Sequence, residues 1–241
     1  MPNHNMIRAC YIFISVVLLF TIMALFNACE KEETPAAPPP DYSYKEEFDT
    51  LENVINKGWL AINNSRPLGT STWRQGIYGT GKGGGFTGIP AHSYKASAAE
   101  YAYVEYTCGE DSATLSCWLI TPVLNIKNGD VISFWTRTGD PPVDYPDRLQ
   151  VYANLTGDGT NVGDTENSIG DFKQLLFDIN KDLTTTGYPT VWTKFEWTVI
   201  GVDSKQRSKA RIGFRYYVTN GGPAGANSNY IGVDDFELKA N

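Results

Sequence analysis

Histidine and cysteine, the side chains best suited to nucleophilic catalysis and to binding transition metals, are scarce in this chain of 241 residues. The histidines and cysteines are His4, His92, Cys10, Cys29, Cys108 and Cys117. A Ser-His-Asp or Cys-His arrangement in the body of the protein would have to use His92. This residue lies in the segment IPAHSYKAS, where no neighbour stands out as a nucleophile or an orienting acid. We interpret His92 as a surface or turn residue and predict that the protein is not an enzyme.

A glycine-rich segment from Gly76 to Lys82, GIYGTGK, matches a phosphate-binding loop up to its last position. There Gly83 replaces the Ser or Thr that would bind Mg²⁺, and no amphipathic helix follows. We interpret the segment as a flexible loop. A carboxylate pair for glycoside hydrolysis stays an alternative, although no pair stands out among the 27 acidic residues.

The N-terminal part of the chain is membrane-seeking, because residues 9–26 contain no charged side chain. The pair Ala28-Cys29 after this segment resembles the lipobox of bacterial lipoproteins, in which the cysteine is acylated and becomes the mature N-terminus. Phe26 occupies the usual Leu position of the lipobox, and Leu25 lies one place earlier. The acid-rich residues 30–33 resemble the surface-export signal of Bacteroidetes lipoproteins.

This resemblance implies a signal peptide over residues 1–28, a lipid on Cys29 and a location at the outer membrane or cell surface. The lipid anchor would then be the only contact with the membrane. An uncleaved N-terminal anchor helix is the alternative. Outside the cytoplasm, the remaining Cys108 and Cys117 are expected to form a disulfide, with two buried free thiols as the alternative.

The pattern after the signal segment predicts a linker and one all-β domain. Residues 29–41 are acidic and then rich in proline, which is typical of an extended spacer. Residues 42–241 form the domain, with one short helix over 51–57. Strands are predicted where β-branched or aromatic residues alternate with polar ones, over 42–48, 101–106, 117–124, 131–137, 148–153, 172–178, 194–200, 210–218 and 230–238. Short strands without βαβ alternation indicate an antiparallel sandwich.

The charge balance argues against nucleic acid as a partner. The chain carries 27 acidic and 20 basic side chains, a formal net charge of −7, and has no basic block. Binding to phosphates requires clustered Lys and Arg. We therefore expect no nucleic-acid partner.

Four segments occur in an order that resembles the choice-of-anchor J, or cleaved adhesin, domain of Bacteroidetes surface proteins. They are WLITP at Trp118, ISFWTRT at Ile132, YPDRL at Tyr145 and IGVDD at Ile231. This family is related to MAM-like jelly rolls and to the adhesin modules of gingipain proteases. The resemblance implies a two-sheet antiparallel jelly roll that acts as a non-catalytic adhesion or glycan-binding module, with a glycan or surface protein as partner. An extracellular glycan-active enzyme and a structural component of a surface assembly are the alternatives.

The aromatic residues fall into two predicted groups. Trp118, Trp135 and Trp197 alternate with polar residues in predicted strands and are expected in the core. The loop-like aromatics Trp73, Tyr78, Phe86 and Tyr94 are the candidates for ligand binding, because exposed aromatics stack on sugars and on protein partners. Filling the mouth of the sandwich is an equal alternative for this second group.

The family resemblance also implies a structural Ca²⁺ that joins the first and last strands. The matching acids are Glu47, Asp49, Asp234 and Asp235, with Asp147 as a further acid. Ca²⁺ prefers oxygen ligands, and a cation bound only by the native state would raise the melting temperature. Solvated surface charges are the alternative. The acidic segment 156–167 lacks the spacing of an EF-hand loop and is expected to be a solvated hairpin insertion.

Overall fold

The computed structural model describes residues 38, 40–79, 88–139 and 144–241. The chain divides into two units, Met1–Pro40 and Asp41–Asn241. The apolar segment 9–26 lies outside the described residues. Among the residues that are described, no helix is long and apolar enough to cross a membrane.

The second unit contains two antiparallel sheets and almost no helix, as the sequence predicts. Sheet 1 has the order β11-β8-β13-β5-β4 with β1 beside β13, and sheet 2 has the order β10-β9-β12-β6-β2 with β3 beside β6 and β7 beside β12. The strands of sheet 1 are β1 (Tyr44–Glu46), β4 (Arg74–Gln75), β5 (Ala102–Glu105), β8 (Val131–Thr138), β11 (Thr193–Thr198) and β13 (Tyr230–Lys239). The strands of sheet 2 are β2 (Leu60–Asn63), β3 (Arg66–Leu68), β6 (Gly109–Ile120), β7 (Leu124–Ile126), β9 (Leu149–Asn154), β10 (Gln174–Ile179) and β12 (Ser208–Gly221). The helices are α2 (Leu51–Asn56) and the 3₁₀ turn η1 (Tyr106–Cys108).

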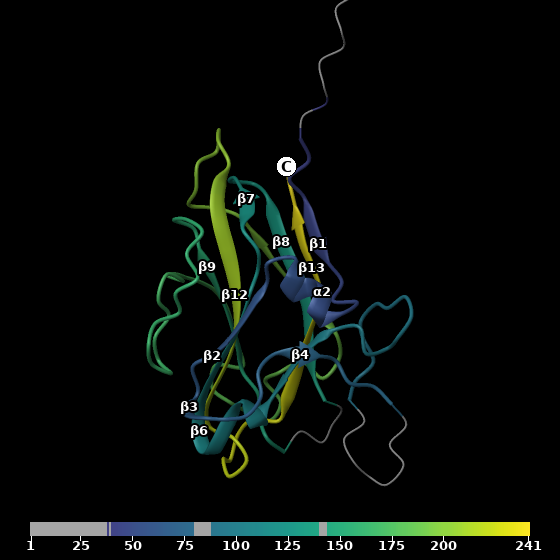
Figure 1. Cartoon of the computed structure of the whole chain (residues 1–241), viewed down its shortest axis with the longest axis vertical. Helices are drawn as coiled ribbons and strands as arrows, with labels where there is room; N and C mark the ends of the chain where they lie inside the picture. The colour runs from purple at the N-terminus through teal and green to yellow at the C-terminus, as the bar shows by residue number, and fades with distance from the viewer. Residues whose placement is uncertain (1–37, 39, 80–87, 140–143) are drawn as a thin grey trace, which may run out of the picture. The chain divides into compact units, whose positions relative to one another are not determined.

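The two sheets lie face to face, with β9 and β12 on one side of the core and β8 and β13 on the other (Figure 1). Alternation of side chains along each strand explains this arrangement, because successive side chains point to opposite faces. In β11, Phe195 and Trp197 pack against the core while Lys194 and Glu196 face solvent. The predicted all-β jelly-roll sandwich is confirmed.

Aromatic rings from both sheets meet in the centre of the core. Phe214 of sheet 2 lies 5.0 Å from Phe134 and 6.0 Å from Phe236 of sheet 1, measured between ring centroids. Trp59, which is fully buried between α2 and β2, lies 5.5 Å from Phe236. These edge-to-face contacts add to the large apolar area that each ring buries. These aromatic contacts therefore hold the two sheets against each other.

Proline accounts for the main difference between the predicted and observed strands. The sequence predicts one strand over 117–124, but β6 ends at Ile120 and β7 begins at Leu124. Pro122 lies between them and has no amide hydrogen to donate to a neighbouring strand. The short strands β2, β3 and β4 were not predicted, because stretches of four, three and two residues are too short to show a clear alternation.

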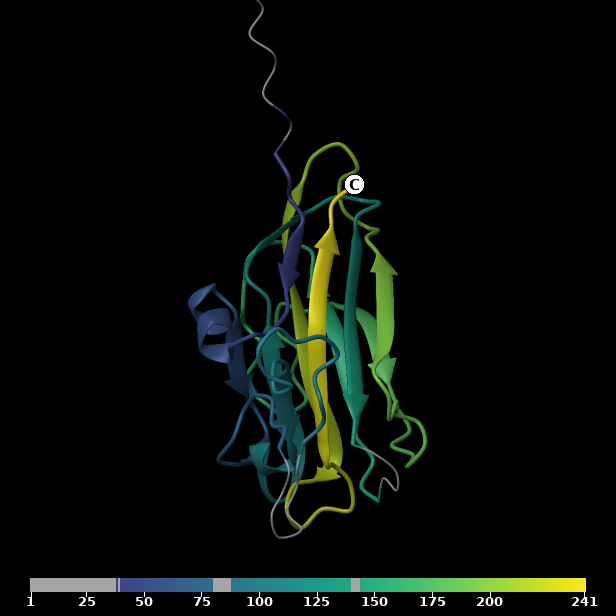
Figure 2. The same ribbon diagram turned by 90° about the vertical axis from the view of Figure 1, so that its right-hand side faces the viewer.

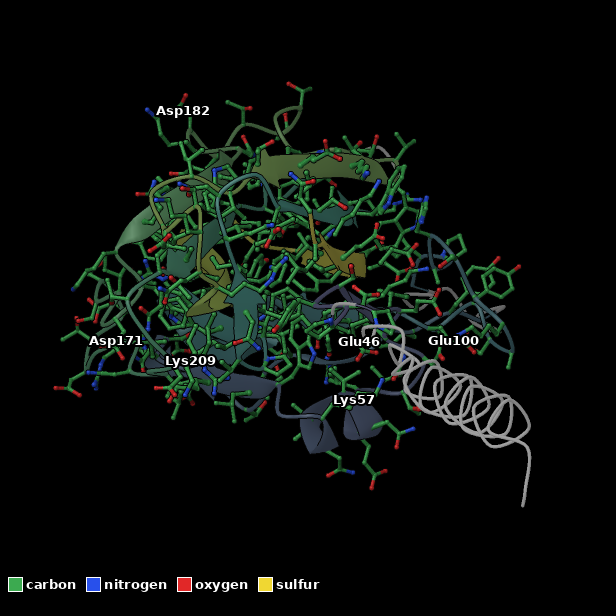
Figure 3. All side chains as sticks on the ribbon, turned by 90° about the horizontal axis from the view of Figure 1, so that it is seen from above. Glu46, Lys57, Glu100, Asp171, Asp182 and Lys209 are labelled. Carbon is green, nitrogen blue, oxygen red and sulfur yellow. The ribbon has the colours of Figure 1, made fainter. Side chains whose placement is uncertain are left out.

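A loop covers the outer face of each sheet. The sheet-1 cover loop, residues 88–100, packs Ile89 on Tyr101, together with Trp192 from the segment before β11. Figure 3 places Glu100 of this loop and Asp171 of the opposite loop on opposite sides of the domain. Each sheet therefore has part of its outer face covered by a loop.

The sheet-2 cover loop, residues 155–172, corrects a prediction. Its segment 156–167 is not a solvated insertion, because Val162 is buried in a cluster with Phe172 and Trp118. The rings of Trp118 and Phe172 lie 5.3 Å apart. Arg215 of β12 donates a hydrogen bond to the main-chain oxygen of Glu166. The loop is therefore attached to sheet 2 through buried apolar residues, although most of its sequence is polar and acidic.

The domain has two distinct ends. The chain enters through β1, whose residue Tyr44 pairs with Leu238 near the C-terminus. The turn between β12 and β13 lies at the opposite end (Figure 2). Loops that join strands at this second end carry the candidate site described below.

Candidate functional site

The acid pair of β13 is held by the backbone of the sheet-1 cover loop. Asp234 is fully buried, and one of its carboxylate oxygens accepts hydrogen bonds from the main-chain nitrogens of His92, at 2.8 Å, and Ser93, at 3.4 Å. Burial, followed by the charge of Asp235, raises the pKa of Asp234 to about 8. Asp234 therefore binds a proton far more readily than a solvated carboxyl group does.

His92 takes part in the same clamp. Its Nδ1 lies 2.6 Å from the carboxylate of Asp235, and its ring stacks on Trp135 at 3.8 Å between centroids. Ser93 donates its hydroxyl hydrogen to Asp235 as well, at 2.9 Å. Because Ser93 contacts the acid and not the imidazole, the three residues do not form the nucleophile–base–acid chain of a hydrolase. They fasten the cover loop to sheet 1.

The other two predicted calcium ligands bind a lysine. The ammonium group of Lys95 lies 2.5 Å from Glu47 and 3.2 Å from Asp49. Hydrogen bonds from Lys45 and Lys95 lower the pKa of Glu47 to about 2. Within the described residues, no group of three or more His, Cys, Asp or Glu side chains is arranged to hold a metal ion. The four acids, in two separately partnered pairs, therefore do not fit one calcium site in this conformation.

The predicted ligand-binding aromatics do not form one surface. Trp73 is 2% exposed and belongs to the core, where its Nε1 donates to the main-chain oxygen of Cys117 at 3.0 Å. The prediction that Trp73 contacts a ligand is therefore wrong, because the loop around it packs between the sheets. Tyr78 and Tyr94 are 54% and 59% exposed, as expected. Phe86 lies outside the described residues, as does the proposed lipid-bearing Cys29.

Cys108 and Cys117 are buried free thiols in the structure, so the expected disulfide is not formed in it. The two residues are nonetheless neighbours across Asn63. This residue pairs with Cys117 between β2 and β6, and its amide donates to the main-chain oxygen of Cys108 at 2.7 Å. Burial and then a hydrogen bond between the two thiols raise the pKa of Cys108. Their pairing on oxidation stays a prediction.

A cavity of about 500 Å³ opens at the end of the domain opposite the chain entry, and we call it the loop-end pocket. Three loops line it, which are η1 after β5, the segment before β9, and the turn between β12 and β13. Its lining residues are Tyr106, Tyr145, Gly222, Pro223, Ala224, Gly225, Ser228 and Asn229. A cavity of this volume lies within the range of small-molecule sites.

Main-chain hydrogen bonds hold the three loops together. Tyr106 donates its amide hydrogen to the carbonyl of Asn229 at 3.0 Å, and Ser228 donates to the carbonyl of Pro146 at 3.0 Å. Gly222 has a φ of +89°, and a Cβ there would lie 2.4 Å from the main-chain oxygen of Asp111. Only glycine fits this close approach. The sequence thus builds a fixed turn from small residues.

Asp147 lies beneath the pocket and joins its walls. It is fully buried and accepts hydrogen bonds from the hydroxyl groups of Thr138 and Tyr216, at 2.6 and 2.5 Å, and from the amide of Asn229, at 2.8 Å. Burial is the main cause that raises the pKa of Asp147 to about 6. Since this acid is already saturated with donors, it positions Asn229 and does not present a free carboxylate to a ligand.

The pocket offers polar groups that the protein itself does not use. The side chains of Tyr106, Tyr145 and Asn229 take part in no hydrogen bond or ion pair within the described part of the chain. Tyr106 is 36% exposed and Tyr145 is 50% exposed. A tyrosine combines an apolar ring face with a hydroxyl group, which suits a ligand that is apolar on one face and hydroxylated at its edges.

A second cavity, of about 450 Å³, lies between the sheet edges β10 and β11. Here the side chains of Asp178, Asn180 and Tyr188 are already engaged. Asp178 binds Arg148 through two hydrogen bonds, at 2.7 and 2.6 Å, and the hydroxyl of Tyr188 bonds to that of Thr136 at 2.7 Å. The loop-end pocket is therefore the better candidate for binding a polar ligand.

Sequence reasoning missed Tyr106, Tyr145 and Asn229 as site residues. Tyr145 belongs to the YPDRL segment, and Tyr106 ends a predicted strand, so each was assigned to the scaffold. The signal that could have found the site is the glycine-rich turn at residues 220–229 that joins two long strands.

No family model matches the sequence, and no curated protein matches it. Solved structures with a similar fold include the K3 cleaved adhesin domain of Lys-gingipain from Porphyromonas gingivalis W83, at 17% identity and a TM-score of 0.50, covering 82% of this chain and 98% of that one. The K1 cleaved adhesin domain of Lys-gingipain from the same organism has 20% identity and a TM-score of 0.49, covering 83% of this chain and 98% of that one. TmCBM61, solved with β-1,4-galactotriose, has 12% identity and a TM-score of 0.42, covering 84% and 99%. The fold is that of a cleaved-adhesin-like jelly-roll domain.

Proposed function

We propose that this protein is a non-catalytic binding module that recognises glycans through the loop-end pocket. The observation that carries the proposal is that the hydroxyl groups of the exposed Tyr106 and Tyr145 and the amide of the half-buried Asn229 have no partner in the described structure. Sugar rings present C–H faces that stack on aromatic rings and hydroxyl groups that exchange hydrogen bonds. The fold it shares with an adhesin domain supports the same class of function.

The engagement of the reactive side chains supports a non-catalytic role. His92 is stacked on Trp135 and bonded to Asp235, while Asp234 and Asp147 accept two or more hydrogen bonds from the protein. A general acid or base needs to reach a substrate proton. These groups are used to fasten loops.

Binding of glycan-array oligosaccharides by wild type and by Tyr145→Ala tests the proposal. We expect binding by wild type and a loss of about tenfold or more in affinity for the variant, because central aromatic residues dominate recognition surfaces. Tyr94→Ala is the matched control, since Tyr94 is similarly exposed but lies in the sheet-1 cover loop. A wild-type protein that binds no glycan but retains a surface-protein partner in pull-down would refute glycan recognition and favour a structural role.

We also propose that the module is held at the outer membrane or cell surface by a lipid on Cys29. Support comes from the uncharged residues 9–26, the Ala28-Cys29 pair and the proline-rich spacer that follows. Mass spectrometry of the protein purified from membranes tests this. An acylated N-terminal Cys29 is expected, and an intact Met1 terminus without lipid would refute it.

A further inference from the structure

Among the residues that the structure describes, those lining the loop-end pocket include no positively charged side chain, and this limits the sugars that the pocket accepts. We propose that its ligand is an uncharged oligosaccharide and that sugars carrying carboxylate or sulfate groups are excluded. This inference rests on the proposed function and narrows it to one class of substrate. It is carried by the chemistry of the lining and by the charges around it.

None of the eight described lining residues is Asp, Glu, Lys, Arg or His. The side-chain groups that face a ligand are the hydroxyls of Tyr106 and Tyr145 and the amide of Asn229. Each can donate and accept hydrogen bonds, as sugar hydroxyl groups do. No ammonium or guanidinium group is present among them to form the charge-assisted bonds by which proteins bind carboxylate and sulfate.

The charged residues beside the pocket are acidic. Glu105 precedes Tyr106, Asp144 precedes Tyr145, and the main chain of Asp111 accepts a hydrogen bond from Ala224 in the turn, at 3.1 Å. Asp144 is exposed. An anionic sugar would therefore approach the exposed carboxylate of Asp144, which has the same sign.

Two arginines close to the lining residues already pair with acidic side chains. Arg74 binds Glu105 and lies 5.1 Å from the ring centroid of Tyr103. Arg148 forms its paired hydrogen bonds with Asp178. Neither guanidinium can pair with a ligand anion without giving up its own acid. An acidic sugar in the pocket would be desolvated without a counter-charge, which is unfavourable.

The size of the cavity sets the length of the ligand. A volume of about 500 Å³ accommodates a short stretch of sugar rings, and the two tyrosines come from separate loops that hydrogen bonds tie to the same turn. This arrangement provides two aromatic contacts and a hydrogen-bonding floor. The pocket is therefore expected to bind oligosaccharides more tightly than monosaccharides.

The experiment measures binding of the full chain, kept in a zwitterionic detergent without sugar headgroups, to two sets of probes. The neutral set contains oligosaccharides of glucose, mannose, galactose and xylose, and the acidic set contains oligogalacturonate, hyaluronan and chondroitin sulfate. At least one neutral probe should bind, and Tyr145→Ala should weaken it about tenfold or more. The acidic probes should not bind wild type. Thermal unfolding of each variant confirms that it is folded.

A variant that adds a positive charge to the pocket tests whether the lack of such a charge is what excludes acidic sugars. Ala224 is exposed in the turn, and its structural contact is made by its main-chain nitrogen, which Ala224→Arg keeps. The new guanidinium should allow an acidic probe that does not bind wild type to bind the variant. Ala240→Arg, near the C-terminus at the other end of the domain, is the matched control and should leave binding of both sets unchanged.

The outcomes separate the two proposals. If an acidic probe binds wild type and Tyr145→Ala abolishes that binding, glycan recognition by the pocket stands and the restriction to uncharged sugars is refuted. If no probe binds, or if binding is the same in Tyr145→Ala and Tyr106→Ala as in wild type, the proposed function fails and this inference fails with it.

Discussion

The sheet-1 cover loop and the loop-end pocket use polar side chains in opposite ways. The chemically versatile groups of His92 and Lys95 in the cover loop, and of Asp234 and Asp235 in β13 beneath it, are all bonded to the protein itself. In the pocket, the hydroxyl groups of two tyrosines and the amide of Asn229 have no partner among the described residues. The residue types that attract attention in a sequence therefore serve the scaffold here, while tyrosines beside a small-residue turn form the open site.

The sheet-1 cover loop and the loop-end pocket differ less in residue type than in how exposed their side chains are and whether those side chains form hydrogen bonds. Asp234 and Asp147 are both buried acids with raised pKa values, one under the cover loop and one under the pocket. Each fixes a loop by accepting main-chain hydrogen bonds. The difference is that the loop above Asp147 carries side chains without partners, whereas the loop above Asp234 is fastened through its own side chains as well.

The largest expected effect is that of Trp73→Ala, which tests whether this residue belongs to the scaffold. Removing a fully buried aromatic side chain should destabilise the domain by about 3–5 kcal/mol. Denaturant unfolding measures this loss. Trp73→Phe keeps most of the packing and should cost less. A fall in glycan affinity without a fall in stability would place Trp73 in the binding site and break the distinction between the two regions.

Oxidation of Cys108 and Cys117 is expected to have the next largest effect. A disulfide that closes a loop of about ten residues stabilises by about 2–3 kcal/mol in the chain-entropy account. The unfolding free energy of oxidised wild type should exceed that of the reduced protein, while Cys117→Ala should show no difference. Cys108 ends η1, which begins at Tyr106, so this bond would also restrain one wall of the pocket. A mass unchanged by a disulfide donor, in place of the loss of two hydrogens, would contradict the pairing.

The pH dependence of stability distinguishes the two buried acids. The folded pKa of Asp234 is about 8, above its ordinary value of 3.8, so between these values the folded state holds a proton that the unfolded state has released. Stability from this group therefore falls as pH rises through the window, by at most about 1.4 kcal/mol per pH unit. For Asp147, with a pKa of about 6, the same trend is confined to lower pH.

Denaturant titrations at several pH values measure this trend. Between pH 6 and 8, the slope due to Asp234 should be absent in Asp234→Asn and retained in Asp147→Asn. Equal slopes in wild type and Asp234→Asn would show that Asp234 is ionised in the folded state. The main-chain nitrogens of His92 and Ser93 would then be bound by a charged carboxylate and not by a protonated carboxyl group.

The smallest expected effect is that of calcium on wild type. Because the Lys95 ammonium already lies between Glu47 and Asp49, millimolar Ca²⁺ should leave the melting temperature of the chelated protein unchanged. Lys95→Ala removes this cation and is the comparison variant. A clear rise in the wild-type melting temperature would restore the calcium site predicted from the sequence, and would mean that the cover loop rearranges on binding.

Alternation within strands made most of the fold predictable. Phe195 and Trp197 point inward in β11 as the pattern requires, and eight of the other predicted strands also appear, with shifted ends. Pro122 ends one predicted strand early and separates it from the next. These features are local, since they depend on side chains that lie one or two residues apart.

The site was less predictable because it depends on long-range contacts. Tyr106 and Asn229 are 123 positions apart in the chain, and only the pairing of β5 with β13 brings them together. The burial of Trp73 likewise depends on sheet packing. The pairing of Lys95 with Glu47 spans 48 positions, and a positive side chain that far away could not be foreseen as the partner of an acid pair.

The pairing of β1 with β13 has a mechanical consequence. A protein tethered through the segment before Tyr44 and attached to a ligand at the loop-end pocket would be pulled from its two opposite ends (Figure 2). The pull on β1 would run along the strand, while its hydrogen bonds to β13 lie across it. These bonds would resist together in shear and would not open one after another, so the attachment point of the domain is suited to bear tension.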